Sequence, residues 1–350
     1  MLDLLLLFIP FFALVLMGWA AARSRWLPLE GIATMNSFVL FFGLSAMVFR
    51  LGASGALVQS GLLGLLLAYG LAGSLITVLA LVWSVRMGLV RRDGGLLALV
   101  TAFPNTGFLG LPLLTGLLGP QAAGPVAATL IVDVLVLSSL CLAWAHSHAA
   151  RNIAKSAMQN GEQKAYDGDP HEAWHAAQAS LRGALRNPLL WAMALGMAVS
   201  WLGWHLPRPF DETVRLLGLS ATPTALFTLG AILARSQMQS AGHEGHAVRI
   251  DVAPSIWAPA LLKLLVHPLL VAGIGWGLQR GGVLLTPSGL LTVTMAAALP
   301  SASNVSMLAE REGANTTLVA RVILWTTAAA LLTVALWAHV LGVQATSATT

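Results

Sequence analysis

The chain has 350 residues, of which 57% are hydrophobic and only 9% are charged. Because a soluble domain carries about 25% charged residues, this composition and a mean hydropathy of +0.78 indicate a membrane protein. The net charge of +5 comes from Lys and Arg scattered without a basic run, which argues against a nucleic-acid partner, and a single Cys excludes a disulfide framework or a cysteine-based metal cluster.

Ten apolar stretches are long enough to be read as membrane spans, each of which needs about 20 residues of helix. The first is expected to be a span and not a cleavable signal peptide, because Asp3 stands where a signal peptide carries positive charge. The only sizeable polar insertion separates five spans from five others. The predicted spans are 2–22, 31–49, 60–85, 94–117, 125–145, 188–205, 212–234, 256–278, 288–309 and 316–340.

We therefore predict an all-α polytopic membrane protein in four parts. Residues 1–145 form a first five-helix repeat, 146–187 a loop, 188–341 a second five-helix repeat and 342–350 a C-terminal tail. Each half has an odd number of spans, so the second half enters the membrane from the opposite side. Two similar halves would then form an inverted repeat.

The two halves are weakly similar. Gly95-Leu96-Leu97 opens the fourth span as Gly289-Leu290-Leu291 opens the ninth, and Phe103-Pro104 corresponds to Leu299-Pro300. Both halves also share an order: a Pro-interrupted span followed by a closely connected last span. This shared order supports duplication more than the few identities do.

The distribution of Lys and Arg predicts the orientation, since cytoplasmic loops are rich in both. Loops after even-numbered spans contain four: Arg50, Arg208, Arg215 and Arg280. Loops after odd-numbered spans contain thirteen: Arg23, Arg25, Arg86, Arg91, Arg92, Arg151, Lys155, Lys164, Arg182, Arg186, Arg235, Arg249 and Arg311. We expect a multi-pass protein of the bacterial inner membrane, with both termini outside and the 146–187 loop in the cytoplasm.

Pro, Gly and Asn interrupt the fourth and ninth spans at residues 103–112 and 299–304. Backbone at membrane depth leaves the helix only where protein or a water-filled cavity satisfies its polar groups, and transporters use such breaks to bind substrates. Helix N-terminal N–H groups attract anions, and Asn amides bind a carboxylate in either protonation state. The alternative, a simple proline kink, is disfavoured because the clusters are matched. The predicted substrate-binding residues are Pro104, Asn105, Thr106, Gly107, Pro300, Ser301, Ser303 and Asn304.

Asp133 lies well inside the fifth span, where a carboxylate is by default a candidate functional group. It is expected either to carry a proton for coupling or to form an ion pair with Lys263 or Arg321, and both roles stay open. The two cations lie near the ends of their spans and can also reach the headgroups. His267, which precedes a proline, is assigned a polar contact between helices.

The 146–187 loop contains His171-Glu172-Ala173-Trp174-His175, a literal match to the HExxH zinc-protease helix. A membrane metalloprotease is thus an alternative of a different class. A short polar loop without a clear third ligand makes a poor metal cavity, so we predict no metal site, no cofactor and no enzyme. No Gly-rich phosphate loop of the Walker type is present, which excludes ATP-driven transport by this chain.

The chain resembles the auxin efflux carrier family, which includes plant auxin exporters and bacterial organic-acid permeases. Phe103-Pro104-Asn105-Thr106-Gly107, followed by Gly110-Leu111-Pro112, resembles the fourth span of the family most closely. Ala298 to Asn304, the stretch Pro223-Thr224-Ala225-Leu226 and Lys263 to Pro268 are also similar to it. The chain departs from the family at Gly43-Leu44-Ser45-Ala46, where a proline usually kinks the second span.

The resemblance implies ten helices in two inverted five-helix repeats. Spans 1, 2, 6 and 7 would form a scaffold, and spans 3–5 and 8–10 a transport domain whose broken fourth and ninth helices cross at the substrate site. The implied cycle is an elevator-like movement of that domain. Dimers are common in the family, which leaves a homodimer open here.

These observations predict a secondary carrier of small organic anions, such as mono- or dicarboxylates or auxin-like acids, working in a lipid bilayer. A bile-acid-type sodium symporter is the alternative within transport, but more acidic groups would be expected around its ion sites. Because Asp133 is nearly the only acid in the spans, uniport or proton coupling is favoured over sodium coupling.

Overall fold

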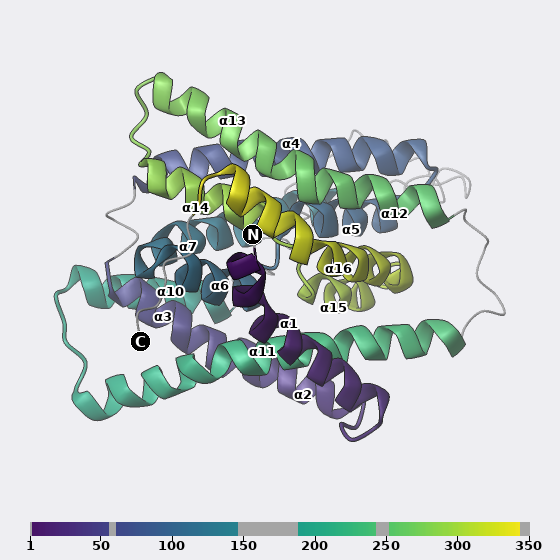
Figure 1. Ribbon diagram of the computed structural model, residues 1–350, viewed down its shortest axis with the longest axis horizontal. Helices are drawn as coiled ribbons and strands as arrows, with labels where there is room; N and C mark the ends of the chain where they lie inside the picture. The colour runs from purple at the N-terminus through teal and green to yellow at the C-terminus, as the bar shows by residue number, and fades with distance from the viewer. Residues whose placement is uncertain (1, 56–60, 146–187, 243–251, 344–350) are drawn as a thin grey trace, which may run out of the picture.

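The computed structural model describes residues 2–55, 61–145, 188–242 and 252–343, and within these ranges it is built from helices (Figure 1). The predicted all-α membrane class is confirmed, since six helices of the described ranges are long and apolar enough to cross a bilayer. The one extended pairing in this part of the chain is an isolated antiparallel bridge between Pro104 and Ser301.

The helices of the first half follow the predicted apolar stretches. The second predicted span is an irregular helix with a π-helical turn, the fourth is broken, and the fifth runs from Ala123 to Ala145 with another π-helical turn. Their bounds are α1 (Leu2–Arg23), α2 (Gly31–Phe38), η1 (Val39–Leu44), α3 (Ser45–Ala53), α4 (Leu62–Arg86), α5 (Arg91–Ala102), η3 (Thr106–Gly110), α6 (Leu111–Leu118), η4 (Pro120–Ala122), α7 (Ala123–Val132) and η5 (Asp133–Leu137).

The helices of the second half also follow the predicted apolar stretches. Side-chain caps begin two of its helices: Thr286 accepts from the Gly289 N–H at 3.1 Å, and Asn315 accepts from the Leu318 N–H at 3.0 Å. The bounds are α10 (Pro188–Trp201), α11 (Arg208–Gly242), α12 (Val252–Leu261), η6 (Leu262–Val266), α13 (His267–Arg280), α14 (Pro287–Ala297), α15 (Asn304–Arg311) and α16 (Thr316–Val340).

The helices form two groups. The first helix group consists of α1, α2, α3, α10 and α11, with α1 packed on α11 and α3 on α10. The second helix group consists of α4 to α7 and α12 to α16, and α4 packs in it against α5, α7 and α13. Figure 1 shows α11 and α2 along the lower edge of the molecule, α1 running from the middle of the view toward them, α4 and α13 along the upper edge, and the broken helices between the two edges.

Reciprocal glycine contacts bring the helices of the first group close together. A Cβ on Gly18 would overlap the Phe227 carbonyl oxygen, and a Cβ on Gly230 would overlap the Val15 carbonyl oxygen. These two glycines join α1 to α11, and Gly52 and Gly196 join α3 to α10 in the same reciprocal way. Small residues at helix interfaces allow this close approach of backbones in membranes.

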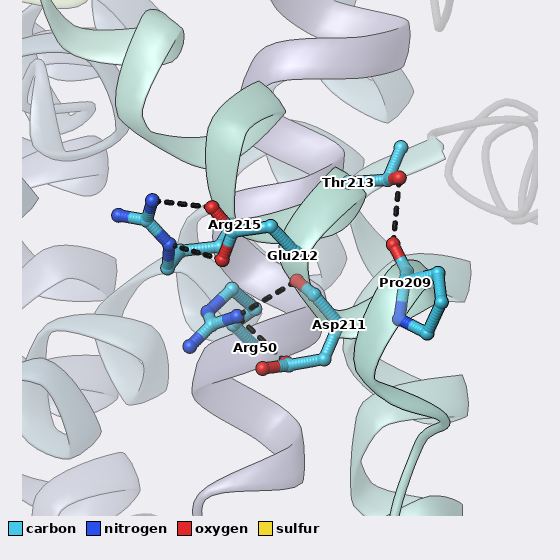
Figure 2. A network of polar contacts seen from close by, with 6 residues as sticks. All are labelled: Arg50, Pro209, Asp211, Glu212, Thr213 and Arg215. Atoms are coloured by element: carbon cyan, nitrogen blue, oxygen red, sulfur yellow. Dashed lines mark hydrogen bonds and ion pairs between the residues drawn. The ribbon is translucent and has the colours of Figure 1, made fainter.

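A polar network ties α3 to the start of α11 (Figure 2). The Arg50 guanidinium donates to both the carboxylate of Asp211, at 2.7 Å, and its backbone carbonyl, at 3.1 Å. Beside it, Arg215 makes a two-pronged contact with Glu212 one turn earlier on α11. The Arg50 and Asp211 side chains are half-exposed, so this network fixes geometry more than it adds stability.

The second span is irregular at the place where the family usually has a proline. The π-helical turn η1 covers Val39–Leu44, and it ends beside Gly43, whose hypothetical Cβ would lie 3.1 Å from the Ala221 Cα atom on α11. A π-turn inserts an extra residue into a helix and is one recognised cause of a bend. The irregularity is therefore present without the proline.

Candidate functional site

The two broken helices meet backbone to backbone in the middle of the second helix group. The Asn105 N–H donates to the Pro300 carbonyl at 2.7 Å, and the Ala302 N–H donates to the Phe103 carbonyl at 2.9 Å. Proline has no N–H and disfavours helical backbone in the residue before it, and Phe103 is indeed extended, with φ −88° and ψ 107°. The prolines thus open the helices, and each open segment satisfies the other.

All eight predicted substrate-binding residues lie at this crossing. Asn105, Thr106, Ser301 and Ser303 are each at most 1% exposed, although they are polar. Ser301 is also bound to α16, because its N–H donates to the Thr326 hydroxyl there at 3.2 Å. The structure therefore brings the two clusters together, so that residues from both sequence halves lie side by side.

Several polar atoms of the crossing are buried without a hydrogen-bond partner. Both atoms of the Asn105 amide are in this state, as are the Asn304 Oδ1 and the Ser301 Oγ. Buried polar groups in proteins are normally satisfied, so an unsatisfied amide at a cavity marks a place for a ligand or water. The Asn105 carbonyl, by contrast, is used twice, by the N–H groups of Leu109 and Gly110.

Backbone N–H groups at the helix starts of both clusters are already engaged. In the first cluster those of Asn105 and Thr106 donate to the carbonyls of Pro300 and Pro104, at 2.7 and 2.8 Å. In the second cluster the N–H groups of Val305 and Ser306 donate to the carbonyls of Ala302 and Ser303, at 3.4 and 3.2 Å. The predicted supply of free N–H groups is thus reduced in both clusters, and the side chains of Asn105 and Asn304 are their polar groups at the cavity. The first cluster keeps its whole Asn105 amide available.

A cavity of about 360 Å³ opens against the crossing. The crossing supplies one wall with Asn105, Gly107 and Asn304, and the fifth span supplies another. The remaining walls come from the first helix group: η1 contributes Leu40, Phe41 and Leu44, and α10 contributes Pro188 and Leu189. The cavity therefore lies between the two helix groups.

Behind the crossing lies a buried polar cluster that we call the Asp133 cluster: Tyr69, Asp133, Lys263 and His267. The Tyr69 hydroxyl donates to the Asp133 Oδ1 at 2.8 Å, and the Asp133 Oδ2 is buried without a partner. The Lys263 ammonium is close enough for its charge to act on this carboxyl, whereas the Thr106 hydroxyl of the crossing donates to the Pro104 carbonyl at 3.5 Å. Asp133 thereby connects the cavity wall to a buried cation.

Lys263 is completely buried within the second helix group. Its ammonium donates to the Ala297 carbonyl at 3.1 Å and lies 3.2 Å from the His267 Nδ1. Ala297 is the last residue of α14, so the ammonium stabilises the negative end of the half-helix that leads into the crossing. Of the two cations predicted as partners of Asp133, Lys263 lies in its neighbourhood, whereas Arg321 is exposed on α16.

His267 was predicted to make a polar contact between helices, but its contact with another helix is ring packing, and its polar neighbour Lys263 lies one turn earlier in the same span. Its ring packs on the Tyr69 ring, with the ring centroids 5.5 Å apart, which joins α13 to α4. Tyr69 itself is a site residue that the sequence reasoning missed. One available signal was its position: 194 residues separate Tyr69 from Lys263, the same spacing that separates Gly95 from Gly289.

The HExxH motif at His171 to His175 lies outside the described residues. Within the described ranges, no group of three or more His, Cys, Asp or Glu side chains could hold a metal ion.

Comparison with known proteins agrees with the crossing motifs. The model of a family described as "Membrane transport protein" matches residues 4–338. The "Putative malonate transporter" of Rhizobium meliloti (strain 1021) is 26% identical over 310 residues, covering 88% of this chain and 86% of that protein. "Auxin efflux carrier component 8" of Arabidopsis thaliana is 22% identical over 288 residues, covering 73% of this chain and 78% of that protein.

A third relative, an "Uncharacterized transporter" of Methanothermobacter thermautotrophicus (strain Delta H), is 25% identical over 330 residues, covering 94% of this chain and 95% of that protein. The family match spans both halves and both crossing motifs, and members of this family are transporters and not enzymes. The chain is therefore a multi-pass membrane transporter, and it belongs to the auxin efflux carrier family of membrane transport proteins.

Proposed function

We propose that this chain is a secondary carrier of small organic anions, such as mono- or dicarboxylates or auxin-like acids, and that it binds them at the crossing. The observation that carries the proposal is the cavity between the two helix groups, whose crossing wall bears the unpartnered Asn105 amide. An amide can donate to a carboxylate, and a ligand in the cavity would satisfy atoms that are otherwise buried without partners. The relatives named for malonate and auxin are compatible with an organic acid.

The transport step that fits this arrangement is an elevator-like movement. The first helix group would be the fixed scaffold, and the second would carry the crossing and its bound anion across the membrane. Support comes from the cavity, because its walls belong to both groups. A movement of one group along the other would expose the same site to each side in turn.

The two halves would be inverted five-helix repeats, with ten spans in all. A pair of equal spacings supports this duplication. Gly18 and Gly196 are as far apart as Gly52 and Gly230, and these four glycines form the two reciprocal helix contacts of the first group. In this duplication α1 corresponds to α10, and α3 corresponds to α11. The contact between α1 and α11 in one pair is therefore the equivalent of the contact between α10 and α3 in the other.

The Asp133 cluster would either couple transport to a proton or hold the crossing together as a charge pair. Among the described residues Asp133 is the one buried carboxylate, and with an ammonium in its neighbourhood it favours uniport or proton coupling over sodium coupling. The expected location is the bacterial inner membrane, with both termini outside and residues 146–187 in the cytoplasm.

Uptake by proteoliposomes from a panel of labelled mono- and dicarboxylates tests the proposal. We expect saturable uptake of at least one acid, and a strongly reduced uptake with Asn105→Ala. The matched control is Asn36→Ala, which removes a buried amide from α2 outside the cavity. If no carboxylate is transported, or if both variants transport like the wild type, the proposal is wrong.

A further inference from the structure

The polar groups of the cavity are concentrated on two of its walls. Asn105 and Asn304 face it from the two broken helices, so one carboxylate can contact amides from both sequence halves. Ser138 and Ser139 add hydroxyls from the fifth span. The Ser138 hydroxyl is already engaged, since it donates to the Asp133 backbone carbonyl at 2.9 Å. The lining thus offers one amide-rich corner for a charged group.

The rest of the lining is apolar. Leu40, Phe41 and Leu44 of the π-turn η1 face the cavity from the first helix group, and Phe108 and Leu142 line it from the second. With about 360 Å³, the cavity lies at the lower end of the range of about 300–1,000 Å³ for small-molecule sites. Its shape and chemistry suit a small ligand with one polar end and an apolar body.

Cationic side chains are missing from the lining among the residues that the structure describes. Lys263, the buried cation of the Asp133 cluster, does not line the cavity: it donates to the Ala297 carbonyl, and its charge acts on Asp133. One carboxylate can be held by amides and by the partial positive charge at the start of a helix. A second carboxylate would lie against leucine and phenylalanine side chains, and no described lining residue offers it a counter-charge, which is unfavourable at an apolar wall.

Resting on the proposed function, we infer that the cavity selects monocarboxylates with an apolar body and discriminates against dicarboxylates. This selectivity differs from what the name of the malonate relative says of that protein. In this chain the amides of Asn105 and Asn304 hold the carboxylate, and the η1 wall with Phe41 holds the body. Selectivity arises because the side chains of the apolar wall offer a second carboxylate neither a hydrogen-bond donor nor a counter-charge.

Binding of three acids to the purified protein, by calorimetry or competition, tests this selectivity. Hexanoate and adipate have the same number of carbons and differ in one carboxylate, and malonate is a short dicarboxylate. We expect the Kd of hexanoate to be lower than that of adipate and of malonate by about tenfold or more, because the second charge has no partner. Equal or tighter binding of either dicarboxylate overturns the selectivity and leaves the organic-anion carrier standing. Binding of none of the three overturns the selectivity as well, and the uptake panel then decides the proposed function separately.

The apolar wall is tested by a pair of neighbouring phenylalanines. Phe41 lines the cavity and Phe42 does not, and both are 56% exposed, so Phe42 is the neighbouring control. Phe41→Ala should weaken hexanoate binding several-fold, whereas Phe42→Ala should retain wild-type affinity. The variant Phe41→Arg adds a cation to the same wall and should reduce the difference between the Kd values of hexanoate and adipate. Two results would contradict the inference that this wall binds the apolar body: an unchanged hexanoate affinity in Phe41→Ala, or an unchanged ratio of the hexanoate and adipate Kd values in folded Phe41→Arg.

Discussion

At the scale of single residues, the charged and amide side chains of the site could be predicted, but their hydroxyl partners could not. Asp133 and Lys263 stand out in the sequence because charges are rare in apolar spans. Thr326 does not, since threonine hydroxyls are common in membrane helices and bond to their own backbone, and Tyr69 is marked only by its spacing from Lys263. Only the packing of α4 and α16 against the crossing reveals that these two hydroxyls bind Asp133 and the Ser301 N–H.

The two asparagines are expected to contribute unequally to substrate binding. Asn105 is 1% exposed with both amide atoms unpartnered, whereas Asn304 is partly exposed. Asn105→Ala should weaken binding of the transported anion by about 1–3 kcal/mol, the range for losing a partner in a buried site. Asn304→Ala should weaken it less. Titration of both purified variants measures this, and wild-type affinity in both would rule out the crossing as the site.

The Asp133 cluster provides a test of charge pairing. Asp133→Asn leaves the buried Lys263 ammonium without its counter-charge, and Lys263→Met leaves the carboxylate alone, so each single variant should lower the thermal unfolding temperature. The double variant should lose less than the sum of the two, because the uncompensated charge is gone. Strictly additive losses in detergent-solubilised protein would show that the two groups do not interact.

The same variants separate the two roles left open for Asp133. If the pair is structural, the double variant regains uptake together with stability. If Asp133 carries a proton for coupling, the double variant folds but its uptake no longer responds to a pH gradient.

At the scale of elements, the helix breaks could be predicted and the π-turns could not. Proline opens a helix by a local mechanism that is visible in the sequence. The π-turns at Val39–Leu44, Asp133–Leu137 and Leu262–Val266 have no such residue in common, because an inserted residue is tolerated wherever tertiary packing favours it. Two of them carry Asp133 and Lys263, and the first lines the cavity, so these irregular turns orient much of the site.

Pro104→Ala should change the path of the fourth span and not only a single side-chain contact. With an N–H restored and the preceding residue released, the fourth span can continue as a helix through the crossing. The Asn105 N–H would then leave the Pro300 carbonyl, and the polar atoms that face the cavity would turn away. We expect a protein that folds and reaches the membrane but transports almost nothing. Wild-type uptake by this variant would show that the break does not depend on the proline.

The glycine contacts of the first helix group predict a stability effect that composition alone does not reveal. In Gly230→Ala the new methyl group would overlap the Val15 carbonyl, so α1 and α11 must separate. Overpacking of this kind costs about 1–3 kcal/mol, and the unfolding temperature should fall accordingly. Gly277→Ala on α13 is the matched control, since nothing lies within 4 Å of its Cβ position. Equal unfolding temperatures of the two variants would contradict a close α1–α11 contact.

At the scale of the whole molecule, the positions of the helices followed from hydropathy, but their partners did not. Membrane helices are apolar on most sides, so their periodicity says little about which face packs against which helix. The division into two helix groups follows from the glycine contacts and the crossing, and these join residues that are far apart in the sequence. The orientation rests on Lys and Arg counts alone and stays a prediction.

Labelling with an impermeant maleimide tests that orientation. Cys141 is completely buried, so Cys141→Ala gives a background without thiols. Two cysteines are then compared: Gln163→Cys in the loop over 146–187, which lies outside the described residues, and Leu284→Cys between α13 and α14, where the native side chain is 79% exposed.

Loops after odd-numbered spans hold most of the Lys and Arg, so the loop with Gln163 should be cytoplasmic, whereas Leu284 follows the eighth span and should lie outside. In right-side-out vesicles the reagent should therefore label the cysteine at 284 at once and the cysteine at 163 only after the membrane is permeabilised. The reverse pattern would invert the protein in the membrane, and labelling of both cysteines in intact vesicles would place the two loops on the same side, which an odd number of spans between them does not allow.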